Sequence, residues 1–213
     1  MKNNMIRIAA FGISALMLAG CNGKNVEVTA NKAKDNEIIV TEKNTVQTVI
    51  KEKFDKKYYK EKELTNFINE DLKEFNEEND TKIKLNSIKV KDKNVYAVID
   101  YKTMMEYNEY NDYKLTSMNS TLAKESSIVP DKLKIYGREK KVAKSEAIEK
   151  DMKVVVLQEK VVATEDSNIP SESKVDFKLT VAGKIKYISG ATKDDSNTAE
   201  IKSLKEPVVI VYK

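Results

Sequence analysis

The chain of 213 residues contains no histidine and no tryptophan, and Cys21 is its only cysteine. Without histidine, neither a Ser-His-Asp nor a Cys-His catalytic arrangement can be built. Zinc, haem and iron–sulfur sites lose their usual ligands, because histidine and cysteine supply most of them. Glycine is also scarce, with six residues and no glycine-rich phosphate loop. We therefore predict no catalytic residue, no cofactor and no metal site, and expect that the protein is not an enzyme.

Arginine is almost absent, with Arg138 the only one after residue 7. Lysine, which supplies nearly all the positive charge, is a compact cation that is poorly suited to bidentate contacts with bases and phosphates. The net charge is +4, of which Lys2 and Arg7 account for two, so the remainder of the chain carries +2. This near-neutral balance predicts that nucleic acid is not a partner.

A long hydrophobic run is also missing, except near the start of the chain. Residues 1–7 are positively charged, and residues 8–19 form an apolar run. That run is shorter than the roughly 20 residues of a transmembrane helix, but it fits the core of a signal peptide. Leu18-Ala19-Gly20-Cys21 follows directly and resembles the lipobox of bacterial lipoproteins. The resemblance implies that residues 1–20 are removed and that Cys21 receives a diacylglyceryl anchor, completed by a fatty acid such as palmitate.

The rest of the chain has the composition of a soluble globular protein, 40% hydrophobic and 34% charged. Residues 22–37 are polar and mostly non-periodic, so we predict a flexible tether over residues 21–37, with a short strand at 26–29 as the alternative. Residues 38–213 then form the extracytoplasmic domain. A division into two subdomains, 38–113 and 114–213, remains open.

The hydrophobic pattern predicts an α+β fold with a mostly antiparallel sheet. Residues 38–54 alternate, which predicts one strand or two strands broken near Lys43-Asn44. Residues 61–79 have helical periodicity and predict an amphipathic helix. Residues 82–103 predict a β-hairpin with a loop at residues 91–94. A one-residue bulge at Asn86-Ser87 brings its apolar residues onto one face, against which the helix packs.

The C-terminal half is expected to be rich in β-structure. Residues 115–122 suggest one or two helical turns, and residues 154–157 are apolar on both faces, as in a central strand. Residues 175–187 keep one parity and predict a long strand bent at Gly183. We further expect a short strand at residues 133–135, a polar loop at 165–174, a turn at 190–200 and a terminal strand at 207–213.

Residues 103–113 predict a short helix that carries a candidate contact patch. Its members are Tyr107, Asn108, Tyr110 and Asn111. Tyrosine rings stack on the apolar faces of sugars, and amides bond to hydroxyl groups, so the patch suggests a ligand contact. In the alternative interpretation, the tyrosines only pack this helix onto the sheet.

Two acidic patterns bear on possible chemistry. Residues 194–200 carry closely spaced oxygen ligands but lack the glycine and late glutamate of an EF-hand loop, which favours a turn over a calcium site. Acid pairs such as Glu106 and Glu109 suggest, as an alternative function, a glycoside or cell-wall hydrolase, which needs two carboxylates across a cleft.

Several segments together resemble a set of lipoproteins from anaerobic, low-GC Gram-positive bacteria. They are the lipobox at Cys21 and residues 64–79, 83–101, 107–111, 147–157, 182–189 and 207–213. The resemblance implies a Gram-positive host and a location on the outer face of the plasma membrane. It carries over no functional residue other than Cys21.

These observations lead to an expected function. We expect a membrane-anchored lipoprotein that binds or scaffolds an envelope glycan, peptide or protein without catalysing a reaction. The hydrolase and a purely structural or assembly role are the alternatives.

Overall fold

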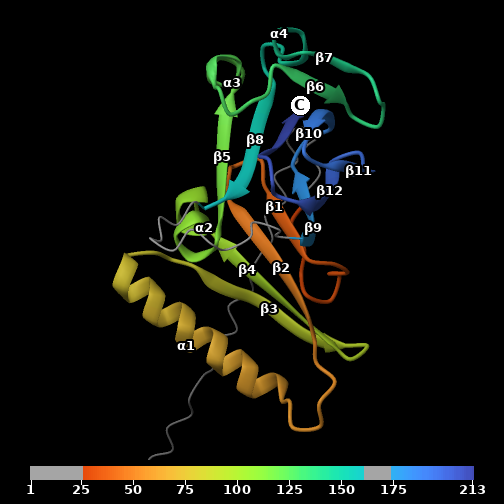
Figure 1. Cartoon of the computed structure of the whole chain (residues 1–213). Helices are drawn as coiled ribbons and strands as arrows, with labels where there is room; N and C mark the ends of the chain where they lie inside the picture. Colours follow the sequence, from red (N-terminus) through yellow and green to blue (C-terminus); the bar gives the residue numbers. More distant parts are fainter. Residues whose placement is uncertain (1–25, 161–173) are drawn as a thin grey trace, which may run out of the picture.

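The computed structural model describes residues 26–160 and 174–213, which form four helices and thirteen strands (Figure 1). The strands make two sheets, in which β1–β9 is the one parallel pair of this described part. This confirms the predicted α+β fold with a β-rich C-terminal half. The predicted signal peptide, Cys21 and nearly all of the loop predicted at residues 165–174 lie outside the described residues.

The first sheet has seven strands drawn from both halves of the chain. In spatial order they are β11 (Thr192–Asp195), β12 (Thr198–Ser203), β9 (Lys174–Val181), β1 (Glu37–Val40), β2 (Val46–Lys53), β4 (Asn94–Tyr101) and β3 (Lys84–Lys91). The break between β1 and β2 confirms the two-strand version of the prediction for residues 38–54.

The second sheet has six strands. In spatial order they are β5 (Tyr113–Asn119), β8 (Lys153–Glu159), β13 (Val208–Tyr212), β10 (Ile185–Ser189), β6 (Lys132–Ile135) and β7 (Lys141–Ala143). The helices are α1 (Glu61–Asn79), α2 (Met104–Tyr110), α3 (Ser120–Glu125) and α4 (Lys144–Ala147). β8 and β13 are central and buried, as predicted for residues 154–157, and β13 pairs with β10, as predicted for the terminal strand.

The helix–hairpin unit agrees with the sequence in detail. α1 covers the predicted range, and its apolar residues contact β3 and β4. Val90 pairs with Val95, Ile88 with Ala97 and Leu85 with Ile99, and the register shifts at Asn86 as the bulge requires. The turn is tighter than the predicted loop: only Asp92 and Lys93 connect the strands, both with positive φ, as in a type I′ turn.

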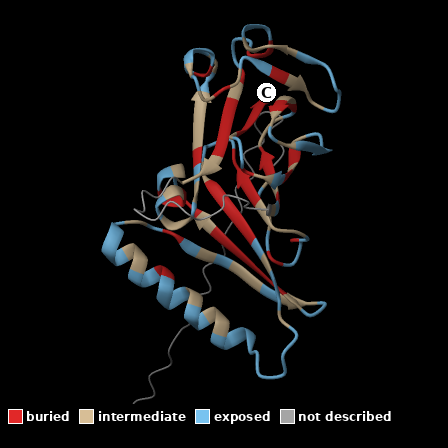
Figure 2. Cartoon of the chain, in the orientation of Figure 1, coloured by how far each residue is buried: buried red, intermediate tan, exposed pale blue. Residues whose placement is uncertain are grey.

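The main core lies between the two sheets and continues beneath α1 and α2 (Figure 2). Each sheet also buries apolar side chains on its other face. On the second sheet that face packs against α3 and α4. On the first sheet it includes Ile39, Val49, Tyr96 and Val98.

The segment from Val26 to Asn36 covers this outer face of the first sheet, which corrects the prediction of a flexible tether for these residues. Residues 26–29 do not form the alternative strand either, and residues 21–25 lie outside the described residues. Ala30 and Ala33 are buried, and the backbone N–H of Ala30 donates to the Ser87 hydroxyl at 2.9 Å. The Lys91 ammonium donates to the Ala33 carbonyl at 2.6 Å and lies over the Tyr96 ring. The tether prediction overlooked that β2 and β4 also carry apolar residues on their second face, which must be covered.

Residues 113–119 correct a second prediction, because they form strand β5 rather than helical turns. Leu115 is buried against the main core, whereas Met118 packs against the core behind the second sheet. Their spacing of three suggested a helix, but the intervening polar residues leave such short runs ambiguous. α3 begins only at Ser120, after the Asn119 side chain caps it by accepting from the N–H of Leu122.

The long strand predicted at residues 175–187 is two strands in different sheets, β9 and β10. The chain crosses between the sheets at Gly183, where a Cβ atom would lie 2.7 Å from the backbone carbon of Lys213. The parity is kept as far as Ile185 and is then lost at a bulge, so that Tyr187 turns away from the main core. Residues 190–200, predicted as a turn, form most of the β11–β12 hairpin.

The two-subdomain alternative places a boundary at residue 113 that does not match the architecture. β9, β11 and β12 come from the second half of the chain but complete the first sheet, and one core joins both sheets. Within the described ranges, no helix combines the length and apolar character needed to cross a membrane.

Candidate functional site

The predicted contact patch on α2 is mostly turned inward. Tyr107 is 1% exposed, and its ring meets the Tyr101 ring edge-on at 5.4 Å between centroids. Burial raises the pKa of the Tyr107 hydroxyl well above its usual value. Tyr107 therefore belongs to the core, as the alternative interpretation of this helix had it, and the contact role predicted for it is wrong.

The two predicted asparagines bind the backbone around α2. The Asn108 side chain accepts from the Leu115 N–H at 2.6 Å and donates to the Leu115 carbonyl at 2.9 Å. Asn111 donates to the Tyr107 carbonyl at 2.9 Å. These bonds end α2 and hold it to β5, so the asparagine amides that suggested ligand binding are already engaged.

Two members of the patch reach surface hollows: Asn108 lines a hollow of about 480 Å³ beside the start of α2, and Tyr110 lines another beside α1. Its hydroxyl donates to Asp71 on α1 at 2.6 Å, and its ring packs edge-on against Phe75. Burial, followed by the Asp71 carboxylate, raises the pKa of this hydroxyl. Tyr110 thus closes one end of a groove between α1 and the first sheet.

We call this hollow, of about 580 Å³, the apolar groove. It is bounded by α1, by β2 and β4, and by the connecting segment 54–60. Its size lies within the range of small-ligand sites. Its apolar lining comprises Ile50, Phe54, Tyr58, Tyr59, Leu64, Phe67, Ile68, Val95, Ala97, Ile99 and Tyr110.

The apolar groove gathers most of the large apolar side chains that are exposed in the described part of the chain. Six large apolar side chains are exposed among the described residues, and four of them line it: Tyr58 (71% exposed), Phe67 (66%), Tyr59 (42%) and Ile50 (40%). Single exposed apolar residues are ordinary, but a contiguous group marks an interaction surface. The sequence indicated part of this group, because Phe67 lies on the apolar face of the predicted helix.

Three aromatic rings form one wall of the apolar groove. Phe54 and Tyr59 lie 4.9 Å apart between ring centroids, and Tyr58 meets Tyr59 edge-on at the same distance. These contacts hold the segment that leads from β2 into α1. Tyr58 and Tyr59 could not be predicted from periodicity, because they lie between the alternating strand and the periodic helix.

Charged side chains surround the apolar groove. Of its three carboxylates, Glu63 pairs with Lys60 at 2.6 Å and Asp71 accepts from Tyr110. Glu52 has no partner among the described residues.

Glu106, from the acid pair that suggested a hydrolase, is buried and accepts from the backbone N–H groups of Lys82 and Lys102.

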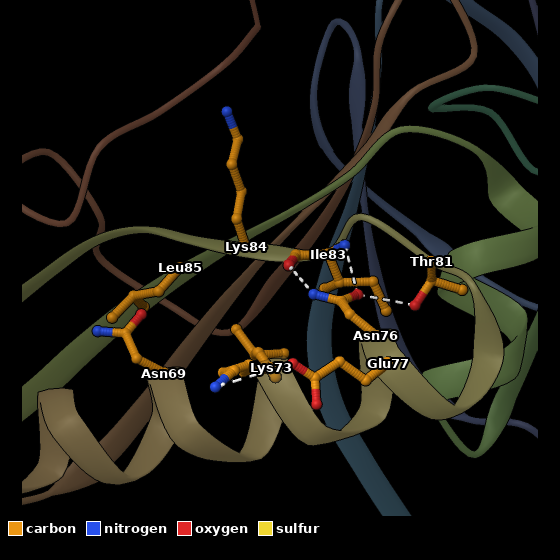
Figure 3. Close-up of a pocket in the computed structure, with 9 residues that line it drawn as sticks. Asn69, Lys73, Asn76, Glu77, Thr81, Ile83, Lys84 and Leu85 are labelled. Carbon is orange, nitrogen blue, oxygen red and sulfur yellow. Dashed lines mark hydrogen bonds and ion pairs between the residues drawn. The ribbon is translucent and has the colours of Figure 1, made fainter.

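A smaller hollow of about 350 Å³ lies on the other flank of α1, against β3 (Figure 3). The Asn76 side chain accepts from the Ile83 N–H at 2.9 Å and donates to the Ile83 carbonyl at 2.7 Å. It also accepts from the Thr81 hydroxyl at 2.7 Å. Because these polar groups satisfy one another, this hollow anchors the helix and offers little to a ligand.

A further cluster of charges lies on the outer face of the first sheet. Lys178 bridges Asp35 at 3.1 Å and Asp194 at 3.0 Å, and lowers the pKa of Asp35. Beside it, burial raises the pKa of Glu37, whose carboxylate accepts from the Thr180 hydroxyl. Asp194, one of the oxygen ligands in the acidic segment 194–200, is therefore used in an ion pair.

No group of three or more metal-ligating acids or thiols is placed to hold a metal ion within residues 26–160 and 174–213. Comparisons with known proteins, by family model, by curated sequence and by solved structure, find no match for this chain. The role of the apolar groove must therefore be inferred from the residues that line it.

Proposed function

We propose that the chain is a lipoprotein anchored through Cys21 on the outer face of the plasma membrane, where it acts as a non-enzymatic binding or scaffolding module. The apolar groove is its contact surface. One observation carries the proposal: four of the six exposed large apolar side chains of the described residues line a single groove. Exposing such a group to water has a cost that a bound partner removes.

The charged groups at the apolar groove support binding over hydrolysis. A glycosidase needs two carboxylates facing each other at a defined separation. Glu63 and Asp71 are engaged with Lys60 and Tyr110, which leaves Glu52 as the one groove carboxylate without a partner in the described ranges.

The short length of chain between Cys21 and the described residues supports a position close to the membrane. Five residue steps separate Cys21 from Val26, where the described segment on the first sheet begins. A fully extended chain spans at most about 3.6 Å per residue, so Val26 lies within about 18 Å of the anchor. A lipidated domain with this connection stays next to the headgroups.

Photo-crosslinking in cells tests the contact surface. A benzoylphenylalanine replaces Phe67 in the apolar groove or, as the matched control, Leu122, which is exposed on α3 away from it. We expect an adduct in the membrane fraction from position 67 and none from position 122. Equal or absent adducts at the two positions would remove the basis for the groove as a contact surface.

The anchor is tested separately by Cys21→Ser. Two acyl chains hold a protein stably in a bilayer, whereas the unlipidated chain has no such attachment. The variant should move from the membrane fraction to the soluble fraction. Retention in the membrane fraction of a chain from which residues 1–20 have been removed would show that Cys21 is not the attachment point.

A further inference from the structure

Charge is divided unevenly along the apolar groove. The segment of residues 53–60, which we call the basic loop, carries four lysines against one aspartate, a net charge of +3. α1 carries seven acidic residues against two lysines, a net charge of −5, and five of these acids lie after residue 69. Because the basic loop leads into the first turn of α1, positive charge flanks one end of the helix and negative charge the other.

These charges share one stripe of the helix with Phe67. An α-helix turns once in 3.6 residues, so positions seven apart lie on nearly the same side. Lys60 precedes Phe67 by seven residues, and Glu74 follows it by seven. Both are exposed, and Glu74 has no ion-pair partner among the described residues. Each charge lies about 10 Å along the helix axis from Phe67, at 1.5 Å per residue.

A surface of this kind is complementary to itself. In a two-fold dimer, residue i of one copy contacts residue j of the other, and j contacts i. If two α1 helices pack antiparallel with the axis beside Phe67, Lys60 of each copy faces Glu74 of the other. Resting on the proposed role of the apolar groove as contact surface, we infer that its partner is a second copy of this chain, packed through α1.

The carboxylates that this arrangement brings together already have partners within their own copy, an ion pair for Glu63 and a hydrogen bond for Asp71. Glu63 precedes Phe67 by four residues and Asp71 follows it by four, so the two face each other across the axis. Glu63 is paired with Lys60 at 2.6 Å, and Asp71 accepts from Tyr110 at 2.6 Å. Lys60 of each copy then lies between its own Glu63 and the partner's Glu74.

The anchor restricts how two copies meet. Both Val26 residues must stay within about 18 Å of the same bilayer, the reach of five extended residue steps. A two-fold axis perpendicular to the membrane satisfies this for both copies at once, because it places the two anchors at equal height. Anchoring of both copies in one bilayer is thus compatible with the symmetric pair.

Disulfide trapping tests the dimer in the full lipidated chain on membranes. Phe67→Cys places a thiol beside the two-fold axis, where it meets its own copy, and Leu122→Cys is the control for chance collisions. No other thiol interferes, since Cys21 is the only native cysteine and its sulfur is blocked by lipid. We expect the covalent dimer to form about tenfold faster at position 67, because packing raises the effective concentration of the two thiols. Equal rates at the two positions would overturn the inference.

Charge exchange tests the pairing itself. Lys60→Glu and Glu74→Lys should each slow trapping of Phe67→Cys, and the two together should restore it. Lys73→Glu, on the flank of α1 that faces β3, is the charge-matched control and should leave the rate unchanged. Failure of the combined variant to recover would exclude this register.

The photo-crosslinking experiment separates the inference from the proposed function. An adduct at position 67 with twice the mass of the chain supports the dimer. An adduct with a different protein overturns the dimer, while the apolar groove remains a contact surface. Absence of any adduct overturns both.

Discussion

The two halves of α1 have the same apolar periodicity but different surroundings. In the C-terminal half, Leu72 is 2% exposed in the main core, and Asn76 ties the helix to the backbone of Ile83. In the N-terminal half, Phe67 is 66% exposed and Leu64 is half-buried beside the apolar groove. Periodicity therefore identifies an apolar face, but it does not say whether the protein's own core covers it.

The largest effect on stability is expected in the C-terminal half of α1, which packs into the main core. Leu72→Ala removes a side chain from the core cluster and leaves a cavity, so it should lower the free energy of unfolding by about 2–5 kcal/mol. Urea denaturation of the unlipidated chain measures this change. A loss below about 1 kcal/mol would mean that this half of α1 is not held by the core.

Asn76→Ala should have the next largest effect. It leaves the backbone N–H and carbonyl of the buried Ile83 without the side-chain amide that bonds to them, which costs about 1–3 kcal/mol. Asn69→Ala, in the same hollow but without a bond to the residues around it, is the control and should change stability by less than about 0.5 kcal/mol. Equal effects of the two variants would contradict the anchoring role of Asn76.

Leu72 and Asn76 belong to the helix–hairpin unit, which is the part of the fold that the sequence predicts best. The helix, the hairpin register and its bulge were predictable because one buried face fixes the register of a strand. The seven-stranded sheet was not, since β9 joins β1 across more than 130 residues and no local pattern specifies that pairing. The packing of residues 26–36 on the outer face of the first sheet was not predicted either, because no local pattern specifies that contact.

The candidate site was predicted less well than the fold. Tyr110 was identified, but Tyr107 and the two asparagines proved to be structural, because tyrosine and asparagine serve cores and caps as readily as ligands. The apolar groove depends on how far α1 stands from β2 and β4. That distance follows from tertiary packing, which a single sequence does not display.

Tyr110→Phe should sharpen the boundary between the two halves. It removes the hydroxyl bond to Asp71 and should cost about 1 kcal/mol. The pKa of this hydroxyl is raised in the folded state, so its contribution is complete below the ordinary tyrosine value near 10 and is lost as the pH rises above it. Unfolding measured at pH 8 and pH 11 should therefore show a smaller loss with pH in the variant than in the native chain. An unchanged pH dependence would argue against the bond.

Phe67→Ser should have the smallest effect on stability and the largest on association. Because the ring is mostly exposed, the free energy of unfolding should change by less than about 0.5 kcal/mol. The same variant should reduce, without abolishing, the yield of the adduct formed from a photoreactive group at Tyr58, which also lines the apolar groove. Clear destabilisation by Phe67→Ser would show that the core holds the N-terminal half of α1 as it holds the C-terminal half.

The insertion of β9 between β1 and β12 has a consequence for how the molecule reaches its folded state. Glu37 of β1 pairs with Lys178 of β9, so the first sheet stays open along one edge until a loop of about 140 residues has closed. Closing long loops slows folding more than it lowers stability, and sheets dominated by distant pairings fold in milliseconds to seconds. The chain should therefore fold slowly and as a single cooperative unit, with unfinished strand edges exposed until the second half arrives.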